Sequence, residues 1–220
     1  MENKDLFSLW KSQGVGIDEV MEVNYRLLKE VKASKAQLAM ESLKKIKTTG
    51  IVAAITYLTI LGLMLAYAIA HYSPASNYFI VSMGIIFAIN VKAFYDYVKH
   101  LVWAHQINYD GPIMEVQEKL SRLRLSIVKH CRAMSLQLPF WTTFYLNGTW
   151  FPQNAGWPYL VFQTLFTGLF CYATYWALKN LRMENSDKKW FKWLVAGSGG
   201  EATARAMRLM KDIEEFKKEA

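Results

Sequence analysis

Long apolar stretches separated by polar segments form the main pattern along this chain. The stretches cover residues 49–72, 78–98, 136–151 and 157–178. A helix needs about 20 apolar residues to cross a hydrocarbon core of about 30 Å. The first and fourth stretches reach that length without a charge, whereas the third is shorter and includes Gln137, Thr142, Thr143 and Asn147. We therefore predict four membrane-spanning helices, of which the third has the weakest pattern.

Charged residues are almost absent from these stretches. Lys92 and Asp96 are the exceptions, and the connecting loops 73–77 and 152–156 contain no Lys, Arg, Asp or Glu. Short loops that remain in the cytoplasm are rich in Lys and Arg, whereas translocated loops avoid them. The asymmetry predicts that the N- and C-termini both lie in the cytoplasm.

The N-terminal polar segment predicts two helices. Residues 5–11 form a short apolar cluster that Gly14 and Gly16 are expected to terminate. Asp18 is then a candidate N-cap for a helix that continues to about Lys47. One face of this second helix has an apolar stripe made of Val20, Val23, Leu27, Val31 and Leu38.

The middle and C-terminal polar segments each predict an amphipathic helix. Apolar residues in the middle segment recur at alternating intervals of three and four positions, at Ile113, Val116, Leu120, Leu123 and Ile127. This helix is expected to enter the third stretch with a kink at Pro139. The last helix, residues 201–219, has a similar seam at Ala202, Ala206, Leu209, Ile213 and Phe216.

An apolar seam on a water-exposed helix has to pack against something. We expect the three cytoplasmic helices to pack on one another, on a second copy or on a protein partner. The residues expected to form that packing or partner surface are Leu120, Leu123, Ile127, Leu209, Ile213 and Phe216.

The predicted fold is all-α, a four-helix transmembrane bundle with cytoplasmic helical extensions and a C-terminal amphipathic helix. Its parts are a cytoplasmic N-terminal helix, a first transmembrane hairpin, a cytoplasmic helical segment, a second hairpin and a cytoplasmic C-terminal helix. They cover residues 1–47, 48–98, 99–135, 136–178 and 179–220, respectively.

Composition changes this interpretation little. The net charge of +8 would indicate nucleic acid in a soluble protein. Here Lys and Arg beside the membrane explain the charge, since they set topology and attract anionic lipid. Nucleic acid is therefore not an expected partner, whereas the lipid bilayer is. Cys131 and Cys171 lie on different helices, and neither is expected to form a disulfide.

Polar residues inside a membrane are functional candidates. Lys92 and Asp96 are four residues apart on one helix face, near the inner edge of the second stretch, and Asn90 lies deeper. Three interpretations are open: the charged pair neutralises itself near the headgroups, bridges two helices, or lines a path for an ion or proton. His100, His105 and His130 are expected at the inner interface.

No motif for catalysis, nucleotide binding or metal binding is present. The sequence therefore predicts no catalytic residue, no cofactor and no metal ligand. Asp96, His100 and His105 form only a weak constellation for a membrane enzyme.

Three segments resemble a family of uncharacterised bacterial four-span membrane proteins that are often encoded beside alternative sigma factors. The segments are DLFSLWKSQ at 5–13, QLPFWTTFY at 137–145 and IEEFKKE at 213–219. The resemblance implies a membrane-tethered regulator in a bacterial inner membrane. It assigns no functional residue.

The leading expectation is a non-enzymatic membrane regulator or scaffold whose cytoplasmic helices bind each other or a protein partner. A homo-oligomer is one form that such binding can take. The alternative is a small transporter or channel subunit with a polar path at Asn90, Lys92 and Asp96.

Overall fold

The computed structural model describes the backbone of residues 2–219 and the side chains of residues 19–216. Over that part of the chain the structure is helical or in turns, without strands. The α-helices are α1 (Glu2–Ala70), α2 (Asn77–His105), α3 (Ile113–Ser135), α4 (Trp157–Asn180), α5 (Lys189–Ala196) and α6 (Gly200–Glu219). Short 3-10 helices are η1 (Pro74–Ser76), η2 (Leu138–Thr142) and η3 (Met183–Asn185). The predicted all-α class is confirmed.

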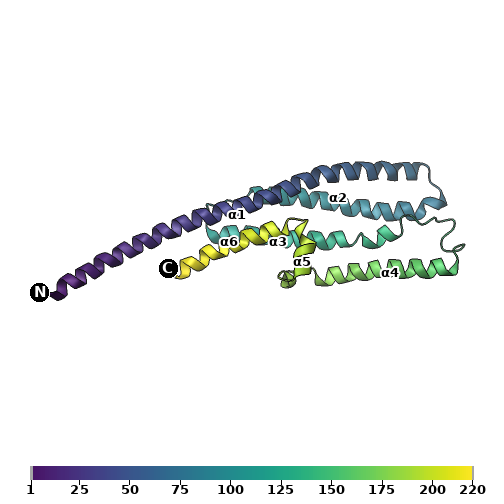
Figure 1. The fold of residues 1–220 in the computed structure, drawn as a ribbon. Coiled ribbons are helices and arrows are strands. Elements are labelled where there is room, and N and C mark those ends of the chain that lie inside the picture. Colours follow the sequence, from purple (N-terminus) through teal and green to yellow (C-terminus); the bar gives the residue numbers. More distant parts are fainter. Residues whose placement is uncertain (1, 220) are drawn as a thin grey trace.

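The molecule is elongated (Figure 1). α1 runs along most of its length and continues beyond the C-terminal end of α6. α2 returns antiparallel to α1, and α6 lies between α1 and α3. α4 packs against η2 and α3 at the opposite end from the N-terminus.

The N-terminal segment differs from the prediction. α1 is one continuous helix from Glu2, so Gly14 and Gly16 do not break it and Asp18 is not an N-cap. A glycine inside a helix costs only about 1 kcal/mol relative to alanine. Propagation through two such sites is possible because each further residue adds a hydrogen bond to an existing helix. The apolar side chains of residues 5–11 lie outside the described side chains.

The third apolar stretch also differs, because it is not an α-helix. α3 ends at Ser135, and η2 and a series of turns follow up to residue 151. Pro139 lacks an N–H group and cannot continue the α-helical hydrogen bonds. A 3-10 conformation rises about 2.0 Å per residue, against about 1.5 Å in an α-helix, so fewer residues cover the same length.

Hydrogen bonds show how far this segment reaches. Gln137 accepts a hydrogen bond from Asn90 Nδ2 at 3.0 Å, and the Gly148 amide donates to Ala75 O at 3.2 Å. The segment thus runs alongside α2 from the level of Asn90 to the loop before its first turn. A Cβ on Gly148 would lie 2.2 Å from Pro74 O, so only glycine permits this approach.

Polar side chains of the neighbouring helices bond this irregular segment. Gln163 Nε2 on α4 donates to Thr142 O at 2.6 Å, and Thr174 Oγ1 donates to Ser135 O at 2.9 Å. Non-helical backbone is tolerated at membrane depth only where protein satisfies its polar groups. Gln163 and Thr174 of α4 therefore help to hold this segment in place.

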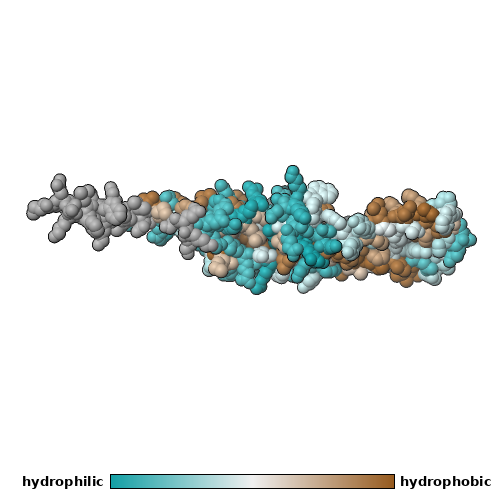
Figure 2. Space-filling view, turned by 90° about the horizontal axis from the view of Figure 1, so that it is seen from below, coloured by the Kyte–Doolittle hydropathy of each residue, from teal (hydrophilic) through white to brown (hydrophobic). Residues whose placement is uncertain are grey.

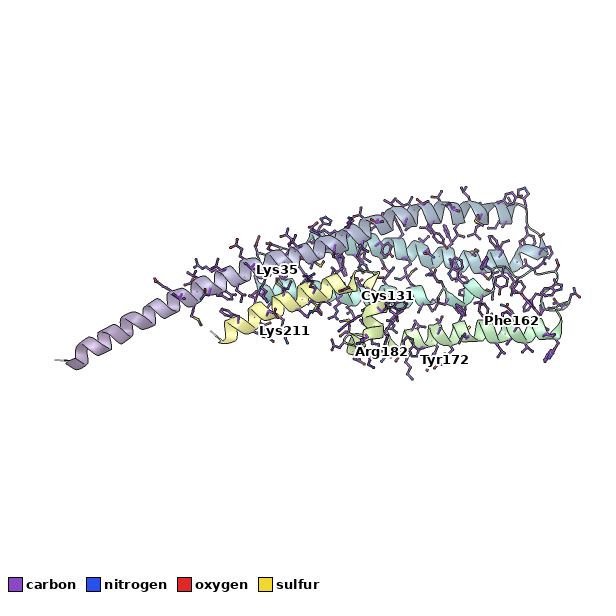
Figure 3. The ribbon with its side chains drawn as sticks, viewed as in Figure 1. Lys35, Cys131, Phe162, Tyr172, Arg182 and Lys211 are labelled. Carbon is purple, nitrogen blue, oxygen red and sulfur yellow. The ribbon has the colours of Figure 1, made fainter. Side chains whose placement is uncertain are left out.

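The outer surface is apolar at the end of the molecule that holds the C-terminal half of α1, the first part of α2, and α4. Figure 2 shows hydrophobic residues gathered over this end and hydrophilic residues over the middle of the molecule. On α4, Phe162 and Tyr172 are more than half exposed, as are Leu165 and Leu169, whereas Gln163 is buried (Figure 3). The helical segments Glu19–Ala70 and Pro74–His105 are long and apolar enough to cross a membrane.

The main core joins α1, α3 and α6. Leu120, Leu123 and Ile127 on α3 are fully buried beside Met40 and Leu43 of α1. On α6, Ile213 is buried, whereas Leu209 and Phe216 are only partly covered. Thr203 and Met210, which the sequence pattern did not select, complete the buried face of α6.

α1 buries a different face from the one its aliphatic stripe predicts. Ala33, Ala36, Met40 and Leu43 contact the core, whereas the stripe from Val20 to Leu38 is exposed. Small alanines let α6 approach closely. The ion pair Lys32–Asp212 links the two helices, and Gly199, with φ of +85°, meets Leu43 at the start of α6. Of the three alternatives that the sequence left open for this stripe, packing within the bundle is not seen among the described residues, and a second copy or a protein partner remains.

Candidate functional site

A cluster of ionisable side chains lies where α1, α2 and α3 meet. Asp96 on α2 is its centre and is almost completely buried. Its Oδ2 atom accepts hydrogen bonds from Lys92 Nζ at 2.5 Å and from His130 Nδ1 at 3.1 Å. The Asp96 carboxylate thus connects α2 to α3.

Two histidines that are distant in the sequence come together in this cluster. The rings of His100 and His130 lie 6.0 Å apart, and both side chains are buried. His100 Nε2 lies 2.9 Å from Ser126 Oγ, while its Nδ1 has no hydrogen-bond partner in the described part of the chain. The sequence predicted all three histidines at the inner interface; the structure buries His100 and His130 within the protein and leaves His105 exposed.

Burial keeps both histidines neutral. It lowers the pKa of His100 to about 3, with nearby Lys47 and His130 adding to the shift. Burial also lowers the pKa of His130, although the hydrogen bond to Asp96 opposes that effect. The low pKa makes His100 a weak base for activating the Ser126 hydroxyl. The pair therefore lacks the properties of a catalytic serine–histidine site.

Lys47 is the residue of this cluster that the sequence pattern did not identify. Its side chain is fully buried, and Nζ has no hydrogen-bond acceptor among the described residues. Nζ lies 4.3 Å from the centroid of the Tyr97 ring, a cation–π arrangement. Burial lowers the pKa of Lys47 to about 8, so the ammonium group is still charged at pH 7.

A signal for Lys47 was present in the sequence. Met40, Leu43 and Lys47 recur at intervals of three and four positions on one helix face. Lys44 and Lys45 lie beside Lys47 in the sequence, however, so all three looked like the solvated basic end of a helix. Lys47 differs from Lys44 and Lys45 only in lying on the face of α1 that the other helices cover.

The polar candidates predicted within the second stretch all bond to protein groups. Asn90 Nδ2 donates to Ile86 O at 2.8 Å and to Gln137 Oε1. Lys92 pairs with Asp96 while its own side chain is 54% exposed. These contacts match the interpretation in which polar groups link helices.

The described part of the chain contains neither a cluster of metal ligands nor a disulfide. No three His, Cys, Asp or Glu side chains converge as possible ligands of one metal ion there. Cys131 and Cys171 are free thiols. Cys131 Sγ donates to Ser198 Oγ at 3.3 Å, at the connection between α5 and α6 (Figure 3).

A second feature is the outward face of α1 over residues 20–38, a segment whose opposite face packs in part against the core and α6. We call it the arm stripe, and its side chains are between 49% and 66% exposed. They are all branched aliphatic residues, namely Val20, Val23, Leu27, Val31 and Leu38. Isolated exposed aliphatic residues are ordinary, but apolar residues that recur on one helix face, here interrupted by the exposed Ser34, form a candidate interaction surface.

The fold and these features define an elongated all-α protein with a long apolar helical hairpin and a polar helical extension. Comparison with family models, with curated proteins and with solved structures finds no match to this chain. The resemblance seen in the three sequence segments therefore has no support beyond those segments.

Proposed function

We propose that this protein is a non-enzymatic membrane scaffold or regulator that holds a cytoplasmic protein through the arm stripe of α1. Residues 49–98 form the membrane anchor, residues 136–178 form a second hairpin, and both termini lie in the cytoplasm. A bacterial inner membrane fits the sequence resemblance.

The distribution of polar groups supports membrane insertion. α4 is apolar on its outer surface and turns Gln163 and Thr174 inward, the reverse of a helix on a water-soluble protein. Exposed apolar side chains lie on α1, α2 and α4, for example Leu63, Val81 and Leu165, and Figure 2 shows apolar patches at this end of the molecule. Without lipid, such a surface would cause aggregation.

The exposure of the arm stripe is the observation that carries the proposal. The seams of α3 and α6 are used within the bundle, whereas the stripe on α1 has no partner among the described residues. An amphipathic helix of a partner protein can pack on such a stripe, because its own apolar residues also recur at intervals of three and four positions.

A different protein fits the stripe better than a second copy does. The α1 helices of two copies in one bilayer have the same direction. If they pack in register through the stripe, each residue faces its equivalent in the other copy. Glu41 and Lys45, both exposed, continue the line of the stripe toward the membrane. Facing pairs of like charge there are unfavourable. Glu41 is already paired with Lys44 within the chain. We therefore infer a helical partner with an apolar face and an acidic group that faces Lys45.

The experiment places a photocrosslinking amino acid at Val23 in native membranes and identifies the crosslinked protein. The affinity of that protein for this purified chain is then measured. We expect Leu27→Asp to abolish the adduct and weaken binding roughly tenfold or more. Gln37→Asp, at an exposed position beside the stripe, is the matched control and should change neither.

Two results would overturn the proposal. One is an adduct that persists in Leu27→Asp, and the other is an adduct formed only with a second copy of this chain. Leu123→Asp is not suited to this test, because Leu123 is fully buried and its loss would disrupt the bundle itself.

The alternative of a transporter or channel subunit has less support. A transport path requires polar side chains that face a shared route for the ion or substrate. Asn90 instead donates a hydrogen bond to Gln137, and Asp96 accepts one from His130.

A further inference from the structure

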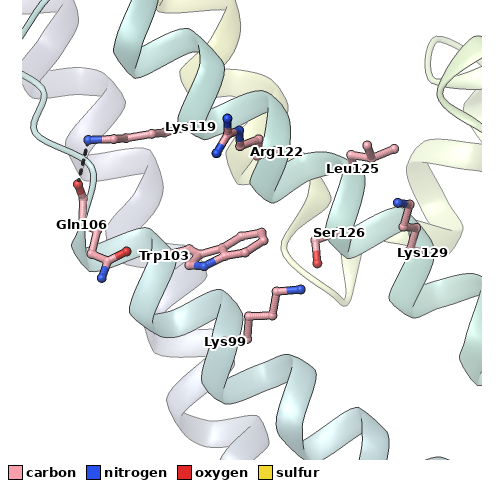
Figure 4. Close-up of a pocket in the computed structure, with 8 residues that line it drawn as sticks. All are labelled: Lys99, Trp103, Gln106, Lys119, Arg122, Leu125, Ser126 and Lys129. Carbon is pink, nitrogen blue, oxygen red and sulfur yellow. Dashed lines mark hydrogen bonds between the residues drawn. The ribbon is translucent and has the colours of Figure 1, made fainter.

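A basic cleft lies between α2 and α3, on the polar side of the proposed membrane anchor. Its volume is about 390 Å³. Figure 4 shows Lys99 and Trp103 on one wall and Lys119, Arg122, Ser126 and Lys129 on the other. No Asp or Glu lines it.

The positive charge of this cleft is only partly compensated. Lys119 and Arg122 form ion pairs with Glu115 and Glu118, each one helical turn away on the outer side of α3. Exposed pairs of this type are weak. Lys99 and Lys129 have no ion pair with any described residue, so both are free to bind an anion.

Trp103 and Ser126 give the cleft a defined floor. Lys99 Nζ lies 4.4 Å from the centroid of the Trp103 ring, and the ring itself packs against the main core. Ser126 is held by its contact with His100. The lysine and the hydroxyl are thereby placed before a ligand arrives, which lowers the entropic cost of binding.

The position of the cleft indicates the kind of anion. Lys99 directly follows the apolar stretch 78–98, and the exposed Leu125 lines the cleft on the α3 side. Basic pockets at this level, with apolar surface beside them, suit phosphate headgroups whose acyl chains lie along the helices.

We propose that this cleft binds the phosphate group of an anionic membrane lipid, with Lys99 and Lys129 as the principal cationic contacts. The proposal rests on the membrane insertion proposed above but not on the arm stripe. Lipid binding and partner binding can therefore fail separately.

The test is native mass spectrometry of the full-length protein in detergent, titrated with phosphatidylglycerol or phosphatidylcholine. We expect phosphatidylglycerol to bind more tightly than phosphatidylcholine. Lys99→Gln/Lys129→Gln should weaken phosphatidylglycerol binding roughly tenfold or more, since two charge-assisted contacts are lost. Lys35→Gln/Lys211→Gln removes the same charge from α1 and α6 (Figure 3) and should leave binding unchanged.

Several outcomes would overturn the proposal. Equal binding of the two lipids would do so, as would equal loss of binding in both double variants. If glycerol 3-phosphate binds as tightly as the lipid, the ligand is a soluble phosphate and the lipid assignment is wrong. Should Lys99→Gln/Lys129→Gln not fold, the single variant Lys129→Gln, which changes one exposed side chain of α3 without an ion pair to any described residue, should still weaken phosphatidylglycerol binding, and unchanged binding would overturn the proposal.

Discussion

Lys47 shows how one residue can oppose the stability of the bundle that contains it. A buried ammonium group loses its hydration, and no carboxylate or carbonyl among residues 19–216 accepts its hydrogens here. The Tyr97 ring returns part of that energy through its cation–π contact. Burial lowers the pKa of Lys47 to about 8, against the opposing charges of Cys131 and Asp96, so desolvation disfavours the ammonium form.

We predict that Lys47→Met stabilises the protein by about 1 kcal/mol, a rise in melting temperature of about 2–4 °C. Methionine fills a similar volume and needs no hydrogen bond. Thermal unfolding in detergent at pH 7 measures the effect, with the exposed Lys45→Met as the control that should not change it. A lower melting temperature for Lys47→Met would show that the charge is required.

The buried histidines predict loss of stability in acid. The folded pKa of His100, about 3, lies below its ordinary value of 6.5. From pH 6.5 downward the unfolded chain binds a proton that the folded chain does not. The contribution to stability is therefore complete above pH 6.5 and declines as the pH falls toward 3. At pH 5 the loss for one histidine is up to about 2 kcal/mol.

Melting temperatures at pH 7.5 and pH 5 measure this dependence. We expect His100→Asn to reduce the difference between the two temperatures, because it removes the group that cannot bind a proton while buried. His105→Asn, an exposed site, should leave the difference as in the unmodified protein. A difference that is unchanged in His100→Asn would contradict the prediction. Lys47, His130, Asp96 and Lys99 surround His100 and are kept in both variants.

At the scale of the helix, α1 and α3 use their apolar residues in opposite ways. The aliphatic seam of α3 is buried, whereas the arm stripe of α1 is exposed and its alanine face is buried. Alanines cannot provide much apolar area, but they let two helix backbones approach closely. The contribution of an aliphatic residue to stability thus depends on whether a neighbouring helix covers it.

We predict that Leu123→Ala destabilises the protein by about 2–5 kcal/mol, because it leaves a cavity in the core. Leu38→Ala, the same substitution in the arm stripe at a residue 66% exposed, should cost less than about 0.5 kcal/mol. Chemical denaturation of both variants in detergent provides the comparison. Similar losses would mean that the stripe is covered in the purified protein.

At the scale of the whole molecule, the two ends differ in surface chemistry. The apolar hairpin and α4 lie at one end, and the basic helices α3, α5 and α6 lie toward the other (Figures 1 and 2). The cluster around Asp96 and the basic cleft both lie between these ends. Ionisable groups at that level can be partly buried and still contact headgroups.

We predict that the loop before α4 lies outside the cell and that the arm of α1 lies inside. In a background with Cys131→Ser and Cys171→Ser, a membrane-impermeant maleimide should label Gln153→Cys on intact cells. Asn24→Cys should react only after the cells are permeabilised. Both positions are exposed, so accessibility of the side chain is matched. Labelling of Asn24→Cys on intact cells would contradict the proposed topology.

The sequence by itself determined the helical class, the apolar hairpin and the periodicity of α3, because these follow from patterns within single segments. Leu120, Leu123 and Ile127 lie in the core as that periodicity suggests. The resemblance, the four spans, the function and the partners stay predictions.

Only the tertiary structure decided which face of α1 is covered, how residues 138–151 cross beside α2, and that Lys47, His100 and His130 meet at Asp96. Periodicity tells that a helix has an apolar face, but not which neighbour covers it or whether any does. Convergence of side chains from three helices depends on the packing of segments far apart in the chain. The 3-10 path of the third stretch likewise required Gln163 and Thr174 of α4 as its hydrogen-bond partners.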